Sequence, residues 1–305
     1  MPKMHIEKSI KVAAPVDKIF KSLTDFNEWQ RWSPWLIQEP EAKVTVAEDG
    51  QSYEWLGNRI GSGNMKITGT EANKKIDYDL NFLKPWKSYA KVWFEMKEEG
   101  DEVNVTWFMD SSLPIFMFWM KKMMEGFVGM DYDRGLRMFK DLMEKGEVDT
   151  DLDIKGETST SGTKYVGVTT TTSMEEMGPQ MAQDLTALGA WTGEHAEISG
   201  PPFTVYHKWD VVKQRVTYTS AIPVKEIPSD LGTFEAGDLP DMKTFVISHK
   251  GAYKHLGNAW STGMNMQQNK TFKGSKKQHP FEVYVNDPAD TAEKELVTEV
   301  HFPLR

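Results

Sequence analysis

Two spacings of apolar residues organise the first half of the chain. Apolar and polar residues alternate, as in a strand with one buried face, over residues 5–12 and over six later segments separated by turn residues. Those six segments are 43–47, 52–59, 64–70, 76–83, 88–98 and 102–109. Apolar residues at helical spacing follow Pro15, and they return on one face of residues 131–145. This order predicts a curved antiparallel sheet that grips a long C-terminal helix.

The second half contains one short phrase twice. Residues 202–206 return as residues 280–284, and each copy belongs to a predicted unit of strand, helix, strand and strand. The expected segments are 165–172, 174–188, 203–209 and 216–222 in the first unit, and 243–250, 253–266, 281–285 and 296–302 in the second. Neither unit can cover its own sheet, so we expect the two to pack as a pseudo-twofold pair. The predicted fold class is therefore α+β in both halves.

A polar segment separates the two halves. Residues 149–163 are rich in Thr, Ser, Gly and Asp and cannot bury enough surface to hold a fold, which is typical of a linker. The chain has 305 residues, which suits two domains of common size. We therefore predict domains at residues 1–148 and 164–305.

Charge and composition exclude several classes of protein. The first 150 residues carry 21 Lys and Arg against 25 Asp and Glu, and the remainder carries 15 against 20. Because neither half is basic, nucleic acid is not expected as the main partner. The chain has no cysteine, which excludes disulfides and thiolate chemistry. The first residues lack the apolar core of a signal peptide, and no apolar run is long enough to span a bilayer. A cytoplasmic location without stable membrane insertion is therefore expected.

Motifs for metal or cofactor chemistry are missing from the sequence. The seven histidines are scattered, and no pair has the spacing of zinc ligands on a helix. Neither a nucleophile elbow nor a dinucleotide fingerprint occurs. We therefore predict no metal site and no cofactor, while the oligomeric state stays open.

The two copies of the repeated phrase differ most in chemistry at their centre. Thr204 in the first copy is replaced by Glu282 in the second. Strand alternation places Glu282 and Tyr284 on one face, and Thr204 and Tyr206 on the matching face of the other copy. We expect the Phe and Val face to pack on the helices and the Glu282 face to line a cleft between the repeats. A carboxylate surrounded by tyrosines suits a ligand that is both apolar and cationic.

Alternatives stay open for the carboxylates. Glu282 could instead be a surface residue on an exposed sheet face, where it would need no partner. Glu299, on the final strand, is a rival that could face the same cleft or be solvated. If the protein is an enzyme, Glu282 would act as general base toward water, with Tyr284 and Tyr206 as hydrogen-bond donors.

Residues 113–128 are unusually apolar and rich in Met. One interpretation is a mobile gate or a membrane-touching face, since Met side chains adapt to varied ligands. The other is the packed start of a helix that contributes to the core. We favour the second, because apolar stripes are usually core.

The opening of the chain carries a family motif. Residues 12–20 and 29–35, with Trp29, Trp32 and Trp35, resemble the polyketide cyclase/dehydrase branch of the SRPBCC (START-like) superfamily. The resemblance covers roughly residues 3–146 and implies a helix-grip fold with a deep apolar cavity between sheet and helix. Members bind lipids, polyketides or hormones, or act as chaperone co-factors, and no catalytic set carries over to this chain.

The second half, from about residue 162 to 305, resembles the GyrI-like (AraC-type effector-binding) small-molecule-binding family. The matching residues are 249–253, Trp260, 280–288 and 296–304. The resemblance implies ligand sensing, or in some members hydrolysis of reactive small molecules, with Glu282 at the pocket floor. Regulators of this family carry a helix-turn-helix domain first, and this chain has a lipid-binding-like domain there instead, so direct control of transcription is not expected.

These observations predict a protein that binds or senses small hydrophobic molecules, cationic ones among them, without a DNA-binding domain. One alternative is a hydrolase in which Glu282 and Tyr284 are catalytic, and another is a cyclase or lipid carrier that works through the N-terminal cavity. The ligand's identity stays open. The candidate ligand-binding residues are Thr204, Tyr206, Tyr253, Trp260, Glu282, Tyr284 and Glu299.

Overall fold

A computed structural model describes residues 2–85 and 87–305. The chain divides into two compact units, Met1–Asp149 and Thr150–Arg305. Both are built from an antiparallel sheet and a few helices, which confirms the predicted α+β class. Among the residues that the structure describes, no helix is both long and apolar enough to cross a membrane.

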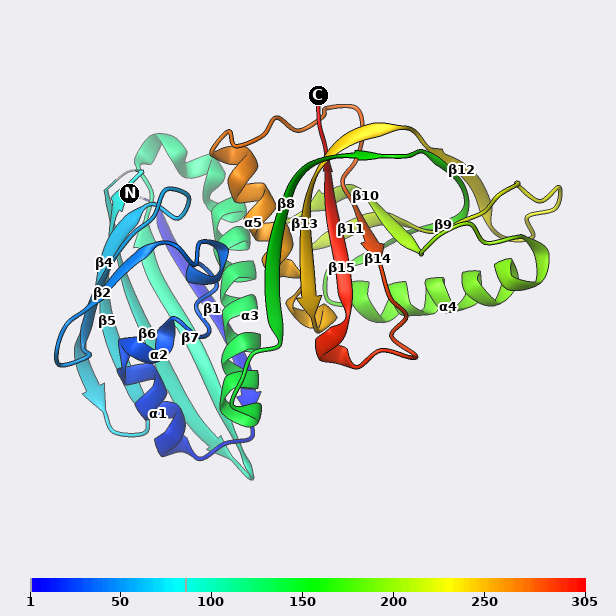
Figure 1. Cartoon of the computed structure of the whole chain (residues 1–305). Coiled ribbons are helices and arrows are strands. Elements are labelled where there is room, and N and C mark those ends of the chain that lie inside the picture. Colours follow the sequence, from blue (N-terminus) through cyan, green and yellow to red (C-terminus); the bar gives the residue numbers. More distant parts are fainter. Residues whose placement is uncertain (1, 86) are drawn as a thin grey trace. The chain divides into compact units, whose positions relative to one another are not determined.

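The first unit is a seven-stranded antiparallel sheet (Figure 1). From one edge to the other its strands are β1 (Lys3–Val12), β7 (Glu102–Ser112), β6 (Ser88–Glu99), β5 (Lys75–Lys84), β4 (Ser62–Glu71), β3 (Ser52–Leu56) and β2 (Lys43–Val46). Five helical segments accompany them: α1 (Val16–Thr24), α2 (Phe26–Trp29), η1 (Leu36–Gln38), η2 (Ile115–Met120) and α3 (Lys121–Lys145). All the strands that alternation predicted are present, and the long helix starts ten residues earlier than expected.

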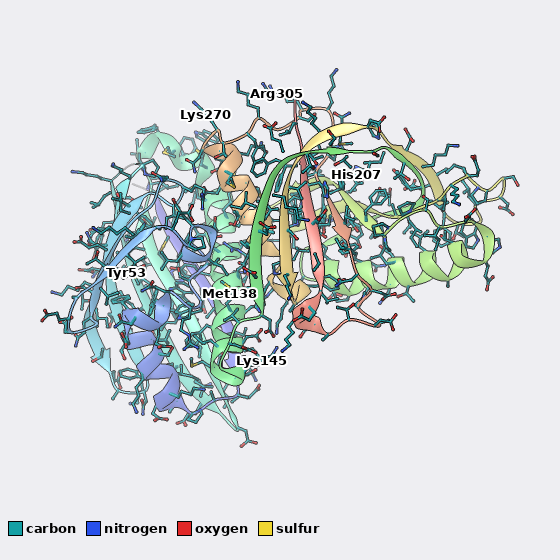
Figure 2. The ribbon with its side chains drawn as sticks, viewed as in Figure 1. Tyr53, Met138, Lys145, His207, Lys270 and Arg305 are labelled. Carbon is teal, nitrogen blue, oxygen red and sulfur yellow. The ribbon has the colours of Figure 1, made fainter. Side chains whose placement is uncertain are left out.

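Aromatic side chains fill the space between this sheet and α3. The rings of Trp107 and Tyr132 stack with centroids 3.9 Å apart. The ring centroids of Trp32 and Phe139 lie 5.0 Å apart. In Figure 2, the labels Tyr53 and Met138 mark the sheet side and the helix side of this core. The deep apolar cavity expected here is therefore occupied by protein. Two cavities of the described residues, of about 310 and 230 Å³, lie instead beside residues 13–16 and residues 36–44.

The apolar segment at residues 113–128 does not behave as expected throughout. Leu113 is buried, and Met124 and Val128 pack against the core. Met117 of η2 also packs against the core, but four of its large side chains are exposed: Ile115 71%, Phe116 73%, Phe118 67% and Trp119 69%. The interpretation of the whole segment as packed core is therefore wrong for η2, which follows the end of β7, beyond the face that the sheet offers for packing.

The second unit is an eight-stranded antiparallel sheet (Figure 1). Its strands, from edge to edge, are β12 (Glu235–Leu239), β9 (Thr163–Ser173), β11 (Arg215–Pro223), β10 (Phe203–Asp210), β14 (Phe281–Tyr284), β15 (Val297–Pro303), β13 (Met242–Gly251) and β8 (Thr150–Thr160). The helical segments are α4 (Met177–His195), η3 (Tyr253–His255), α5 (Gly257–Gln268) and η4 (Glu293–Glu295).

The strand order has the predicted twofold character. β9, β11 and β10 of the first repeat mirror β13, β15 and β14 of the second, and β10 pairs with β14 at the centre. In that pairing Thr204 lies opposite Glu282, so the pseudo-twofold axis passes between the two residues that distinguish the repeats. The two edge strands follow the same symmetry, because each pairs with a strand of the other repeat. β8 precedes β9 in the chain but pairs with β13, and β12 precedes β13 but pairs with β9.

The predicted linker is mostly an ordered strand. Residues 150–160 form β8, which pairs with β13 from Thr150 opposite Gly251 to Thr160 opposite Met242. The prediction at 149–163 was wrong because a polar composition suits an edge strand with one face in solvent as well as a loop. The Thr residues favour strands because they are β-branched. Leu152 packs on the core beside β13.

Candidate ligand-binding site

Glu282 lies at the centre of the second sheet and faces the helices. Its side chain is 3% exposed, and it is surrounded by Met181 of α4 and Trp260 of α5. The expectation that the Phe and Val face would pack on the helices was wrong. Phe281 and Val283 lie on the opposite face of β14, in a separate apolar cluster with Phe203 of β10. Glu282 is thus an interior residue, and the surface interpretation is excluded.

Three neutral donors hold the carboxylate. The hydroxyls of Tyr206 and Tyr284 donate to Oε2 at 2.8 and 2.9 Å. The indole Nε1 of Trp260 donates to Oε1. Among the described residues, no Lys, Arg or His forms an ion pair with Glu282. The site therefore presents a buried carboxylate that is hydrogen-bonded but has no counter-charge.

The pKa values of this cluster follow from its burial. Loss of solvent raises the pKa of the Glu282 carboxyl, and the hydrogen bonds from Trp260, Tyr206 and Tyr284 lower it again, with burial the larger effect. The pKa values of Tyr206 and Tyr284 stand well above their ordinary value, first because of burial and then because of the Glu282 charge. Both tyrosines are therefore neutral hydrogen-bond donors, and the one group that can change charge is Glu282.

Thr204 and Met181 complete the inner part of the site. The Thr204 hydroxyl lies 3.1 Å from the hydroxyl of Tyr284. The sulfur of Met181 lies 3.1 Å from the Tyr284 hydroxyl and 3.7 Å from that of Thr204. Both residues are buried. Because the Met181 thioether is flexible, the inner part of the site can adapt its shape.

Aromatic rings form the outer part of the site. Tyr206 stacks on Trp209 with centroids 5.2 Å apart and meets Trp260 edge-on at 4.9 Å. Tyr253, on η3, packs edge-on against Tyr284 at 5.8 Å and is partly exposed. Such rings attract cations through their π faces. In this structure they close over the carboxylate, and Tyr253 is the member nearest solvent.

Glu299 does not belong to this cluster. In the pairing of β14 with β15 it lies opposite Val283, whereas Val300 lies opposite Glu282, so Glu299 points to the other face. There it forms an ion pair with Lys155 of β8 and lies 3.3 Å from Nε2 of His301. These neighbours, His301 first, lower the pKa of Glu299 to about 2 against the opposing effect of burial. Its chemistry is that of a partnered structural carboxylate.

The structure therefore brings together six of the seven predicted residues, and it adds Met181 and Trp209. Met181 lies among the inward positions of the predicted helix 174–188, so helical spacing is the signal that points to it. Trp209 follows the repeated phrase by three residues, and nothing in its spacing distinguishes it from a core residue. Within the described ranges, no group of three His, Asp or Glu side chains is placed to hold a metal ion.

The fold divides into two units, and comparison of the sequence with protein-family models shows the same division. Residues 3–144 match the family described as polyketide cyclase / dehydrase and lipid transport. Residues 160–305 match the GyrI-like small molecule binding domain. The resemblance of each half is thereby confirmed, and the chain joins a polyketide cyclase-like domain to a GyrI-like domain.

Three solved structures are each similar to about half of this chain. The C-terminal domain of EcmrR is 15% identical, with 51% of this chain and 98% of that one covered and a TM-score of 0.41. SAV2435 bound to tetraphenylphosphonium is 14% identical, with 51% and 94% covered and a TM-score of 0.40. The Aha1 dimer from Colwellia psychrerythraea is 18% identical, with 47% and 98% covered and a TM-score of 0.36. No curated protein matches the sequence.

Proposed function

We propose that the GyrI-like unit binds an apolar organic cation, whose charge pairs with Glu282 and whose body packs among the aromatic rings. The observation that carries the proposal is the buried carboxylate of Glu282, which accepts hydrogen bonds from Tyr206, Tyr284 and Trp260 and pairs with no basic side chain of the described residues. A buried charge without a counter-charge is costly, and a bound cation removes that cost.

The geometry also supports selectivity for large apolar cations over small inorganic ones. Three rings of the site have centroids within 6.0 Å of one another, namely those of Tyr206, Trp209 and Trp260. A ligand inserted here therefore contacts rings on several sides. A small hydrated ion would lose its water without gaining that contact area. Entry requires the outer rings to move, and Tyr253, which is partly exposed, is the first that the ligand meets.

A hydrolase in the same site is the second candidate, because a carboxylate with a raised pKa is suited to act as general base. The hydrogen bonds favour the binder. The two oxygens of Glu282 already accept three donors, which leaves fewer lone pairs to take a proton from water. Glu282→Gln separates the two functions, since an enzyme variant would still bind its substrate and cease to convert it.

Binding of rhodamine 6G, an apolar monocation, tests the proposal by fluorescence anisotropy. Glu282→Gln keeps the shape and removes the charge, and we expect it to weaken binding roughly 10–100-fold, the loss typical of a charged interaction. Affinity of the unchanged protein should rise with pH, because protons compete with the cation for Glu282. The neutral dye Nile red should bind both proteins equally and without this pH dependence.

Glu299→Gln is the matched control, because it removes a carboxylate from the opposite face of the same sheet. Rhodamine binding should survive that change. If Glu282→Gln and Glu299→Gln weaken binding alike, or if neither does, the carboxylate has no role as counter-charge and the proposal is wrong.

A further inference from the structure

The exposed side chains of η2 belong to a larger apolar surface at one end of the first sheet. η2 follows directly on the end of β7, where Ser112 pairs with Lys3 and Ser111 with Ala90. The strand ends and turns at that end carry further exposed apolar side chains. The exposed set is Leu56, Leu83, Tyr89, Ile115, Phe116, Phe118 and Trp119. We call this set the apolar end of the first unit.

Registers show that these residues share one end of the sheet rather than lying scattered. Leu56, the last residue of β3, pairs with Ser62, the first residue of β4. Ser62 in turn pairs with Lys84 at the end of β5, next to Leu83. Phe82 of β5 pairs with Ser88 at the start of β6, next to Tyr89. The apolar end is therefore a continuous rim of strand ends, extended by η2. Exposed apolar surface of this extent marks an interaction site.

Lysines surround the apolar end, and few of them are paired. Four exposed lysines at the same strand ends or at the start of α3, namely Lys3, Lys84, Lys87 and Lys122, form no ion pair in the part of the chain that the structure describes. Lys121 pairs only with Glu125 on its own helix, at 3.6 Å.

The opposite end of the sheet is different. Its lysines are neutralised there, with Lys74 paired to Glu71, and both Lys97 and Lys11 paired to Glu99. Exposed aromatic rings and lysines without an ion pair thus lie together at this end, although the whole chain carries a net charge of −9.

We propose that the apolar end docks peripherally on an anionic lipid bilayer. Trp119, Phe116 and Phe118 would enter the headgroup region, where amphipathic aromatic rings are favoured. The lysines would lie against lipid phosphates, each contributing attraction at the surface. A second copy of the chain fits this end less well. A twofold contact would set the same unpaired lysines against one another.

Co-sedimentation of the full chain with vesicles tests this inference. We expect the protein to pellet with vesicles of equimolar phosphatidylglycerol and phosphatidylcholine, to bind vesicles of phosphatidylcholine alone much less, and to be released by salt. Phe116→Ser combined with Trp119→Ser should weaken binding by at least about tenfold, from the apolar area lost. Combined Lys84→Gln, Lys87→Gln and Lys122→Gln should weaken it roughly fivefold per lysine.

Two control variants from the second unit match these changes. Val212→Ser removes an exposed apolar side chain from the turn between β10 and β11. Combined Lys213→Gln, Lys276→Gln and Lys277→Gln removes three exposed lysines and so changes the net charge of the chain equally. Both control variants should bind vesicles as the unchanged protein does.

Three results would overturn the inference. The first is an absence of binding to anionic vesicles. The second is equal loss in the test and control variants, which would make binding a matter of total charge. The third is a dimer, seen by light scattering, that dissociates in the Phe116→Ser and Trp119→Ser variant, because a second copy would then be the occupant.

Discussion

Thr204 and Glu282 lie opposite each other where β10 pairs with β14, and the Tyr284 hydroxyl reaches both side chains. The two repeats thus meet at the position where they differ in charge. Had both copies carried glutamate, two carboxylates would face each other across the axis. With one threonine, a single charge lies at the centre of a symmetric shell. The asymmetry is what allows a buried carboxylate at this place.

This relationship predicts that Thr204 cannot be replaced by glutamate, the residue at the equivalent position of the second repeat. Thr204→Glu should destabilise the second unit by on the order of 4 kcal/mol, since it adds a second buried charge without a partner. Thr204→Val keeps the volume and should cost only about 1 kcal/mol, from the lost contact with the Tyr284 hydroxyl. Urea unfolding of both variants measures the difference. Equal losses would mean that volume, not charge, limits this position.

Glu282→Gln should change stability with a definite dependence on pH. Burial raises the folded pKa of Glu282 above its ordinary value of 4.5, so the folded state disfavours the charge. The contribution of Glu282 to stability is then complete below the unfolded pKa and is lost as pH rises through the folded pKa. Glutamine escapes this loss, and the variant should gain in stability over the unchanged protein as pH rises.

Glu299→Gln should show the opposite sign. His301 and Lys155 lower the folded pKa of Glu299 to about 2, so its contribution is present above the unfolded pKa and is lost as pH falls. At neutral pH this variant should therefore be less stable than the unchanged protein. Thermal unfolding across pH compares the two variants, and the same sign for both would contradict the assigned environments.

His249 should make the second unit sensitive to acid. It is buried, its Nε2 lies 2.9 Å from the Thr150 hydroxyl, and burial together with His255 lowers its pKa to about 4. Its contribution is complete above the unfolded pKa of 6.5 and is lost as pH falls through 4, up to about 3 kcal/mol. His249→Gln should flatten the stability curve between these values.

Limited proteolysis distinguishes β8 from a flexible linker. Lys155 lies within β8 where the register with β13 shifts, and its side chain forms an ion pair with Glu299, so trypsin should cleave after it slowly in the native protein. Cleavage after Lys213, in the turn between β10 and β11, should come earlier. Mass spectrometry of the fragments over time gives the order. Early cleavage after Lys155 would mean that the strand is not stably paired.

Strand alternation and the repeat were sufficient to predict most of the fold. Both signals depend on which side chains must be buried, and burial is what the sheets provide. β8 was missed because an edge strand buries little, and Leu152 and Ile154 are the only large apolar side chains among its residues, so its polar composition was interpreted as a linker. The prediction for η2 was wrong for the reverse reason. Its composition resembles core, and only the place where β7 ends shows that nothing packs over it.

The candidate site was predicted in its residues but not in its orientation. Comparing the two phrases identified Glu282, and alternation correctly joined Tyr284 and Tyr206 to it. The helix-facing side was expected to be the one with Phe and Val, because apolar side chains suit packing on helices. In the structure, Trp260 from α5 supplies a third donor, and this satisfies the carboxylate beneath the helices. The alternation of residues along one strand cannot predict a hydrogen-bond donor that comes from a distant helix.

The exchange of β8 and β12 bears on how the second unit is made during translation. β8 is the first strand of this unit to leave the ribosome, yet its partner β13 follows only after β9, α4, β10, β11 and β12. β15, which joins β13 to β14 in the middle of the sheet, is synthesised last of all. Until then the nascent chain holds several open strand edges, which are prone to pair wrongly. The unit therefore completes its sheet only when its last strand has emerged, and a ribosome that stalls before Val297 leaves two unjoined halves.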